Sequence, residues 1–182
     1  MEYSVIMSGF GGQGVLMMGE LLAFCAMKAG LNVTWMPAYG VEMRGGAANC
    51  TVVLSEEKIG APLTGKPAAV IAMSEPALNK FASWLQDEGL LMINSSLIRD
   101  SGDLKSNGLR KIEIPTLSLA SEIGNEKMAN LTMLGAFMAC SGIINLDEAV
   151  GQIEHFLPES KKKLAPEMEK ALYKGKDYLQ SL

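Results

Sequence analysis

Short apolar runs alternate with longer, helix-like segments over the first two thirds of the chain. The runs have the length and composition of buried strands, and we predict strands over residues 5–7, 32–36, 48–54, 68–73, 90–94 and 111–114. Lys58 and Ile59 are interpreted as a short antiparallel return strand. Alternating strands and helices predict a three-layer α/β fold, in which helices cover both faces of a mostly parallel sheet.

The remaining segments predict helices over residues 14–29, 74–86, 118–123, 128–142, 146–156 and 159–182. Helix 14–29 is apolar nearly all round, and residues 128–146 contain no charged side chain. The length of that second run suggests a membrane span, but Asn130, Thr132 and many small residues favour a helix packed in the core or against a subunit. We expect both apolar helices to leave surface for a subunit contact.

Four glycines lie in a loop between the first strand and the first helix: Gly9, Gly11, Gly12 and Gly14. This Rossmann-like order points backbone N–H groups at an anion, and three of the glycines have the dinucleotide-binding spacing G-x-G-x-x-G. A ribose-binding acid should follow about 20 residues on, but residues 32–39 contain none, which disfavours NAD or FAD. A phosphate or cofactor contact and a ligand-free tight turn both stay open.

A second loop, residues 37–46, follows the second strand and carries Tyr39, Glu42, Arg44 and several glycines. In a doubly wound sheet it lies at the same carboxyl edge as the glycine loop. Arg44 can hold a phosphate or carboxylate with two parallel hydrogen bonds. Alternatively, Glu42 and Arg44 form an internal pair that orders the loop, or both contact a partner subunit.

The composition of the chain argues against several classes of function. The chain has 182 residues, 48% hydrophobic and 20% charged, which is typical of one globular domain spanning residues 1–182. A net charge of −4 argues against nucleic-acid binding. Cys25, Cys50 and Cys140 have no cluster or zinc spacing, and His155 is the single histidine. We therefore predict no catalytic residue and no metal ligand. With no basic leader before the first strand, we expect a cytoplasmic protein without a membrane segment.

The two loop motifs are specific for a protein family only when they occur together. Residues 9–15 followed by 39–46 resemble the gamma subunit of 2-oxoacid:ferredoxin oxidoreductases, and the resemblance extends through the order of strands and helices, including Asn130. One departure is Val41, where the family usually has proline. Residues 43–50 look more like the 2-oxoglutarate and branched-chain types than the pyruvate type, and 2-oxoglutarate is the expected substrate.

The resemblance implies a subunit that is inactive alone. Partner alpha and beta subunits would bind thiamine diphosphate and decarboxylate the 2-oxoacid. Iron–sulfur clusters in an iron–sulfur subunit or ferredoxin would take the electrons. Coenzyme A would capture the acyl group. The cofactor-binding residues implied for this chain are Gly9, Gly11, Gly12, Gln13, Gly14, Tyr39, Glu42, Arg44, Gly45 and Gly46. The alternative function is a free-standing nucleotide- or coenzyme A-binding module outside a redox complex.

Overall fold

The computed structural model describes residues 2–40, 46–100, 102 and 108–182. In this part of the chain six strands form one sheet in the order β2-β3-β1-β4-β5-β6. The strands are β1 (Glu2–Phe10), β2 (Asn32–Tyr39), β3 (Ala47–Ser55), β4 (Ala69–Ala72), β5 (Leu90–Asn94) and β6 (Arg110–Ile114). β1, β4, β5 and β6 are parallel, whereas β3 runs antiparallel to both β1 and β2. The predicted mostly parallel α/β fold is confirmed.

The short return strand predicted at Lys58 and Ile59 is wrong: both residues lie in the loop between β3 and β4. Both edges of β3 are already paired, one with β1 and the other with β2. A strand returning from the end of β3 therefore has no open edge of β3 to pair with. The first strand is also longer than the apolar run 5–7 that indicated it, because β3 pairs with it from Glu2 to Phe10.

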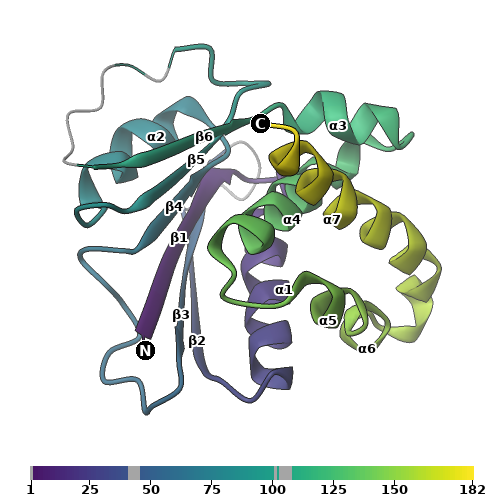
Figure 1. Cartoon of the computed structure of the whole chain (residues 1–182), viewed down its shortest axis with the longest axis horizontal. Helices are drawn as coiled ribbons and strands as arrows, with labels where there is room; N and C mark the ends of the chain where they lie inside the picture. The colour runs from purple at the N-terminus through teal and green to yellow at the C-terminus, as the bar shows by residue number, and fades with distance from the viewer. Residues whose placement is uncertain (1, 41–45, 101, 103–107) are drawn as a thin grey trace.

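Helices lie on both faces of the sheet, but unequally (Figure 1). One face carries α1 (Val15–Lys28), α3 (Thr116–Glu122), α4 (Ala129–Ser141), α5 (Leu146–Val150), α6 (Ile153–Phe156) and α7 (Ala165–Gln180). The other carries α2 (Glu75–Phe81), continued by a 3₁₀ turn at Ala82–Trp84. The sheet has a hydrophobic core on each face, and alternate residues of β1 point into one or the other. Val5 and Met7 pack in the larger core, and Ile6 packs in the core under α2. The predicted helices at 146–156 and 159–182 are each interrupted, since α6 is separate from α5 and α7 follows a 3₁₀ segment, Glu159–Leu164.

The apolar helix α4 is covered by the chain itself. Every residue from Ala129 to Met138 is buried, and α7 packs closely along it (Figure 1). Over Ala129–Met138 the expected free surface for a subunit is therefore absent, because α7 and α3 pack on the sides that the sheet leaves open. Residues 139–142 at the end of the helix remain partly exposed. On α1, Met27 remains 56% exposed. In the described part of the chain, no helix has the length and hydropathy needed to cross a bilayer.

Candidate functional site

The glycine loop and the second loop meet at one edge of the sheet. β1 and β2 flank β3, so Gly9 and Tyr39 both pair with the same residue, Ala48. Beyond the strands, the Gly11 N–H donates a hydrogen bond of 2.8 Å to the Gly46 carbonyl. The predicted meeting of the two loops is confirmed for the residues that the structure describes. Glu42, Arg44 and Gly45, which the sequence also placed in the site, lie outside those residues.

A pocket of about 450 Å³ opens where the loops meet, at the start of α1. Four of the residues implied by the sequence line it, together with five others: Gly11, Gly12, Gly14 and Tyr39, then Phe10, Val15, Leu16, Met17 and Ala48. Two of the glycines have left-handed backbone, with φ of 101° at Gly12 and 72° at Gly14, a conformation that a residue with a Cβ adopts only at a cost. The loop therefore needs glycine there for its shape.

The start of α1 presents backbone donors to this pocket. The first α-helical hydrogen bond runs from the Met18 N–H to the Gly14 carbonyl, 3.0 Å. The N–H groups of Val15, Leu16 and Met17 come before that bond and therefore have no carbonyl acceptor within the helix. No side chain caps this end, and its first turn contains no acidic residue. Helix N-termini of this kind carry partial positive charge and bind anions. The arrangement is suited to a phosphate or carboxylate.

Gly9 and Gln13 shape the loop and do not line the pocket. The Gln13 side chain accepts a bond from the Phe10 N–H at 2.6 Å and donates one to the Met73 carbonyl at 3.1 Å. A Cβ at Gly9 would collide with the Gln13 side-chain oxygen and lie 2.8 Å from the Met73 Cβ. Gln13 therefore ties the loop to the end of β4, and Gly9 leaves the space for it to do so.

Asn130 supports the loop from the other side. Its Nδ2 donates to the Gly14 carbonyl at 3.2 Å and lies 3.9 Å from the Met17 Sδ. The side chain is only 3% exposed, and its Oδ1 has no hydrogen-bond partner among the described residues. A Cβ at Gly14 would collide with this amide. Asn130, at the first turn of α4, thus fixes the position of Gly14, the residue that precedes α1.

A buried polar chain extends the support to the neighbouring strands. The Met73 carbonyl that accepts from Gln13 also accepts from Asn94 Nδ2 at 3.5 Å, and Asn94 Oδ1 accepts from the Thr116 hydroxyl at 2.7 Å. The Thr116 carbonyl in turn accepts from the Thr132 hydroxyl at 3.4 Å. The glycine loop is therefore linked to the ends of β4 and β5 and to the starts of α3 and α4.

The sequence missed several residues of the site. Phe10, Met17 and Ala48 line the pocket. Phe10 could have been found from its place inside the glycine loop. Asn130 is an amide at the start of a helix that is otherwise mostly apolar, which is the sequence signal for a buried polar contact.

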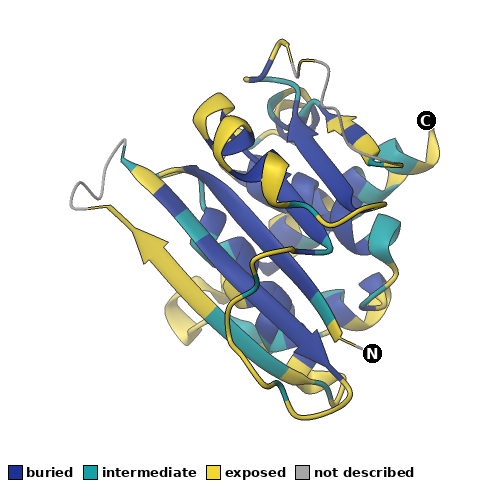
Figure 2. Ribbon diagram, turned by 90° about the vertical axis from the view of Figure 1, so that its left-hand side faces the viewer, coloured by how far each residue is buried: buried dark blue, intermediate teal, exposed yellow. Residues whose placement is uncertain are grey.

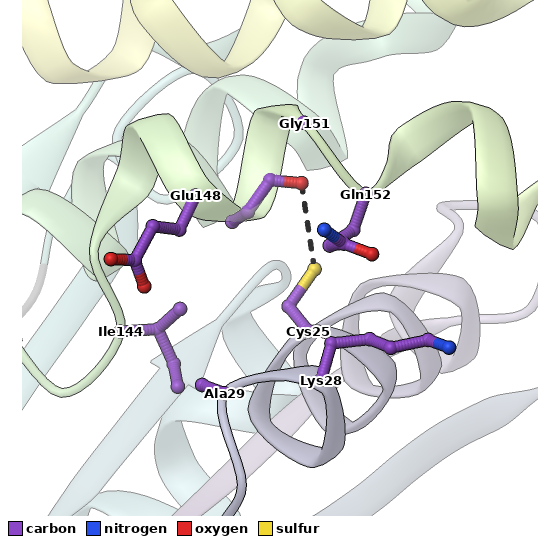
Figure 3. Close-up of a pocket in the computed structure, with 8 residues that line it drawn as sticks. Cys25, Lys28, Ala29, Ile144, Glu148, Gly151 and Gln152 are labelled. Atoms are coloured by element: carbon purple, nitrogen blue, oxygen red, sulfur yellow. Dashed lines mark hydrogen bonds between the residues drawn. The ribbon is translucent and has the colours of Figure 1, made fainter.

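The two buried cysteines, Cys25 and Cys50, offer no reactive group. Burial raises the pKa of the Cys25 thiol to about 12, and that of Cys50 also to about 12. Figure 3 shows Cys25 in a second pocket of about 330 Å³, where its Sγ donates to the Ala149 carbonyl at 3.7 Å and Lys28 and Glu148 lie nearby. A thiol of so high a pKa is a poor nucleophile. Among the described residues no three acids, histidines or cysteines gather in a way that could hold a metal ion.

Fold and site define an α/β protein with a glycine loop and a pocket at an uncapped helix N-terminus. The chain belongs to the family described as pyruvate ferredoxin/flavodoxin oxidoreductase, whose model matches residues 4–178.

Three relatives show how the match is distributed. The ketoisovalerate oxidoreductase subunit VorA of Methanothermobacter marburgensis is 42% identical over 147 residues, covering 81% of this chain and 30% of the relative. The 2-oxoglutarate synthase subunit KorC of the same organism is 29% identical over 163 residues, 87% of this chain and 88% of the relative. A crystal structure of the keto/oxoacid ferredoxin oxidoreductase gamma subunit from Geobacter sulfurreducens has a TM-score of 0.80 at 26% identity, covering 99% of both chains. The chain thus spans 30% of the length of VorA and most of the other two.

Proposed function

We propose that residues 1–182 form a single gamma-type domain that acts as the gamma subunit of a cytoplasmic 2-oxoacid:ferredoxin oxidoreductase. The complex would convert a 2-oxoacid and coenzyme A to acyl-coenzyme A and CO₂, with reduction of ferredoxin. The observation that carries the proposal is the family match over residues 4–178, combined with two loops that meet at the start of α1. The partners are alpha and beta subunits and an iron–sulfur subunit or ferredoxin, which hold the thiamine diphosphate and the iron–sulfur clusters.

The part of this chain in the reaction is to bind coenzyme A. Its phosphates suit the backbone donors at the start of α1, where Gly11, Gly12, Gly14 and Tyr39 line the pocket. Gly9 and Gln13 hold the loop in that shape. We assign the adjoining loop residues to the same site: Glu42, Arg44, Gly45 and Gly46.

The identities to the relatives change the expected ranking of the substrates. The expected substrate was 2-oxoglutarate, but the relative named for ketoisovalerate is 42% identical and the one named for 2-oxoglutarate is 29% identical. We therefore rank a branched-chain 2-oxoacid first and 2-oxoglutarate second. Selectivity between them would lie mainly in the partner subunits that hold the 2-oxoacid.

A free-standing nucleotide- or coenzyme A-binding module is the second candidate. It is supported by the pocket at the start of α1, an end of the helix that no side chain caps. The two functions differ in their dependence on partner subunits, because only the gamma subunit needs them for turnover.

Substitution of Arg44 tests the proposed site in the assembled complex. Arg44→Lys keeps the charge but loses the planar fork, so the apparent affinity for coenzyme A should fall about 10–100-fold, the equivalent of one lost charge-assisted hydrogen bond. Arg44→Ala should cost at least as much. The control is Arg110→Lys at the start of β6, on the opposite edge of the sheet. An unchanged KM for coenzyme A in both Arg44 variants would remove Arg44 from the site, and failure to assemble would make it an interface residue.

A further inference from the structure

A third pocket, of about 300 Å³, lies among the helices that cover the larger core. Its walls come from α1, α6 and α7 and from the 3₁₀ segments Glu126–Met128 and Glu159–Leu164. These helices lie on the face of the sheet opposite α2, behind the strands in the view of Figure 2. Three methionines from separate segments line the pocket, and we call it the methionine pocket: Met17, Met128 and Met168.

The interior of the methionine pocket is apolar. Phe156, Leu157 and Leu164 line it together with the methionines. The Phe156 ring packs against the Phe24 ring, with the centroids 5.6 Å apart, so this wall is held from behind. Methionine side chains are flexible and polarisable, and they adapt to the shape of what they contact. The interior is therefore suited to the apolar body of a ligand.

The opening of the pocket is charged. Lys127, Lys161 and Glu20 line it, and all three are exposed to solvent. Neither lysine forms an ion pair with a residue that the structure describes. The acids beside them in the sequence, Glu126 and Glu159, bond to other side chains. Two positive charges and one negative charge thus face a ligand at the opening, which favours an anionic head group.

We propose that the methionine pocket binds a small apolar carboxylate. The hydrocarbon body would lie among the three methionines and the carboxylate between Lys127 and Lys161. A volume of about 300 Å³ is at the lower end for small-molecule sites, so it suits one short body and not a large cofactor. A single carboxylate matches the net charge of +1 at the opening. A neutral apolar ligand would leave both ammonium groups without a partner, and a cationic one would be repelled.

This site is separate from the glycine-loop pocket, although the two share one side chain. Met17 lines both pockets, whereas Met128 and Met168 line the methionine pocket and not the other. Signals from the three methionines can therefore show which of the two pockets a ligand occupies. The proposal does not rest on the proposed function, because it needs neither coenzyme A nor partner subunits.

The test is a titration of the full-length chain with hexanoate. Isotope-labelled methionine methyl groups are followed by NMR, and their signals are assigned by replacing each methionine with leucine. The signals of Met17, Met128 and Met168 should shift together with one dissociation constant. Acetate lacks the apolar body and should bind at least about 10-fold more weakly. Hexanol lacks the charge and should bind about 2–5-fold more weakly than hexanoate.

Three substitutions at the opening should change the dissociation constant for hexanoate in opposite directions. Lys127→Gln and Lys161→Gln should each raise it about 2–5-fold, and Glu20→Gln should lower it by a similar factor. The matched control is Lys163→Gln, an exposed lysine of the same 3₁₀ segment that does not line the pocket. Solvent screens its charge, so the control should change the constant less than about 1.5-fold. Thermal unfolding of each variant confirms that the fold is kept.

Several outcomes would overturn the proposal. If the Met128 and Met168 signals do not shift, hexanoate does not enter the methionine pocket, and a shift of Met17 alone would place it in the glycine-loop pocket. If hexanol binds as tightly as hexanoate, or both lysine variants bind hexanoate like the wild type, the opening does not recognise a carboxylate. If the methionine signals shift only when partner subunits are added, the pocket receives a side chain of a partner instead.

Discussion

At the scale of single residues, the buried thiols connect folding to pH. Burial raises the pKa of both Cys25 and Cys50 from 9.0 to about 12. In the folded state these thiols stay protonated up to high pH, while in the unfolded chain they lose their protons above pH 9. The stability that they contribute is therefore fully present below pH 9 and is lost as the pH rises toward 12.

We expect the free energy of unfolding to fall as the pH increases from 9 to 11, by up to about 1.4 kcal/mol per pH unit for each thiol. Cys25→Ala removes one titrating group, so its unfolding free energy should fall less steeply over the same range. Urea unfolding under reducing conditions at several pH values measures both slopes. Equal slopes for wild type and Cys25→Ala would show that this thiol titrates alike in the folded and unfolded chain.

The glycine loop shows what residue spacing can and cannot predict. The spacing of Gly9, Gly11 and Gly14 correctly indicated a turn between a strand and a helix. The spacing could not show which residues face the pocket and which support the turn, because both roles favour small or polar residues. Gln13 has both amide atoms bonded within the protein. Asn130 lies more than a hundred positions away in the sequence, so local pattern could not connect it to Gly14.

At the scale of elements, two glycines allow α4 and α7 to pack in close contact. A Cβ at Gly135 would collide with the Leu172 carbonyl, and a Cβ at Gly175 would collide with the Thr132 carbonyl. The uncharged run at 128–146 correctly predicted a tightly packed helix. Hydrophobicity alone could not show whether a subunit or α7 covers it, since either would bury the same side chains.

Gly135→Ala should therefore destabilise the fold, although alanine is the better helix former by about 1 kcal/mol. The added methyl group would collide with backbone atoms, which cannot change rotamer as a side chain can. Overpacking of this kind costs about 1–3 kcal/mol or more. Gly151→Ala is the control, because its Cβ would lie 3.5 Å from the Glu148 carbonyl oxygen, an ordinary contact. The control should change the unfolding free energy by less than about 0.5 kcal/mol. Equal stability of the two variants in urea would contradict the close packing of α4 on α7.

At the scale of the whole molecule, the order of strands and helices was largely predictable, because buried strands and apolar helices have distinct lengths and flanking residues. The direction of β3 was not predicted. The connection from Tyr39 to Ala47 joins β2 and β3 as neighbours, and that antiparallel pair places the second loop beside Gly11. The two loops thus come together through sheet topology, which produces the pocket from segments that are separate in the sequence.

The central claim is that this chain works as a gamma subunit and has no turnover by itself. The direct measurement is reduction of methyl viologen by the partner alpha, beta and iron–sulfur subunits, assembled with and without this chain. The substrates are coenzyme A with either 2-oxoisovalerate or 2-oxoglutarate. The account predicts coenzyme A-dependent reduction when the chain is present, and none from the chain alone or from the partners alone. Full activity of the partners without the chain, or turnover by the chain alone, would contradict it.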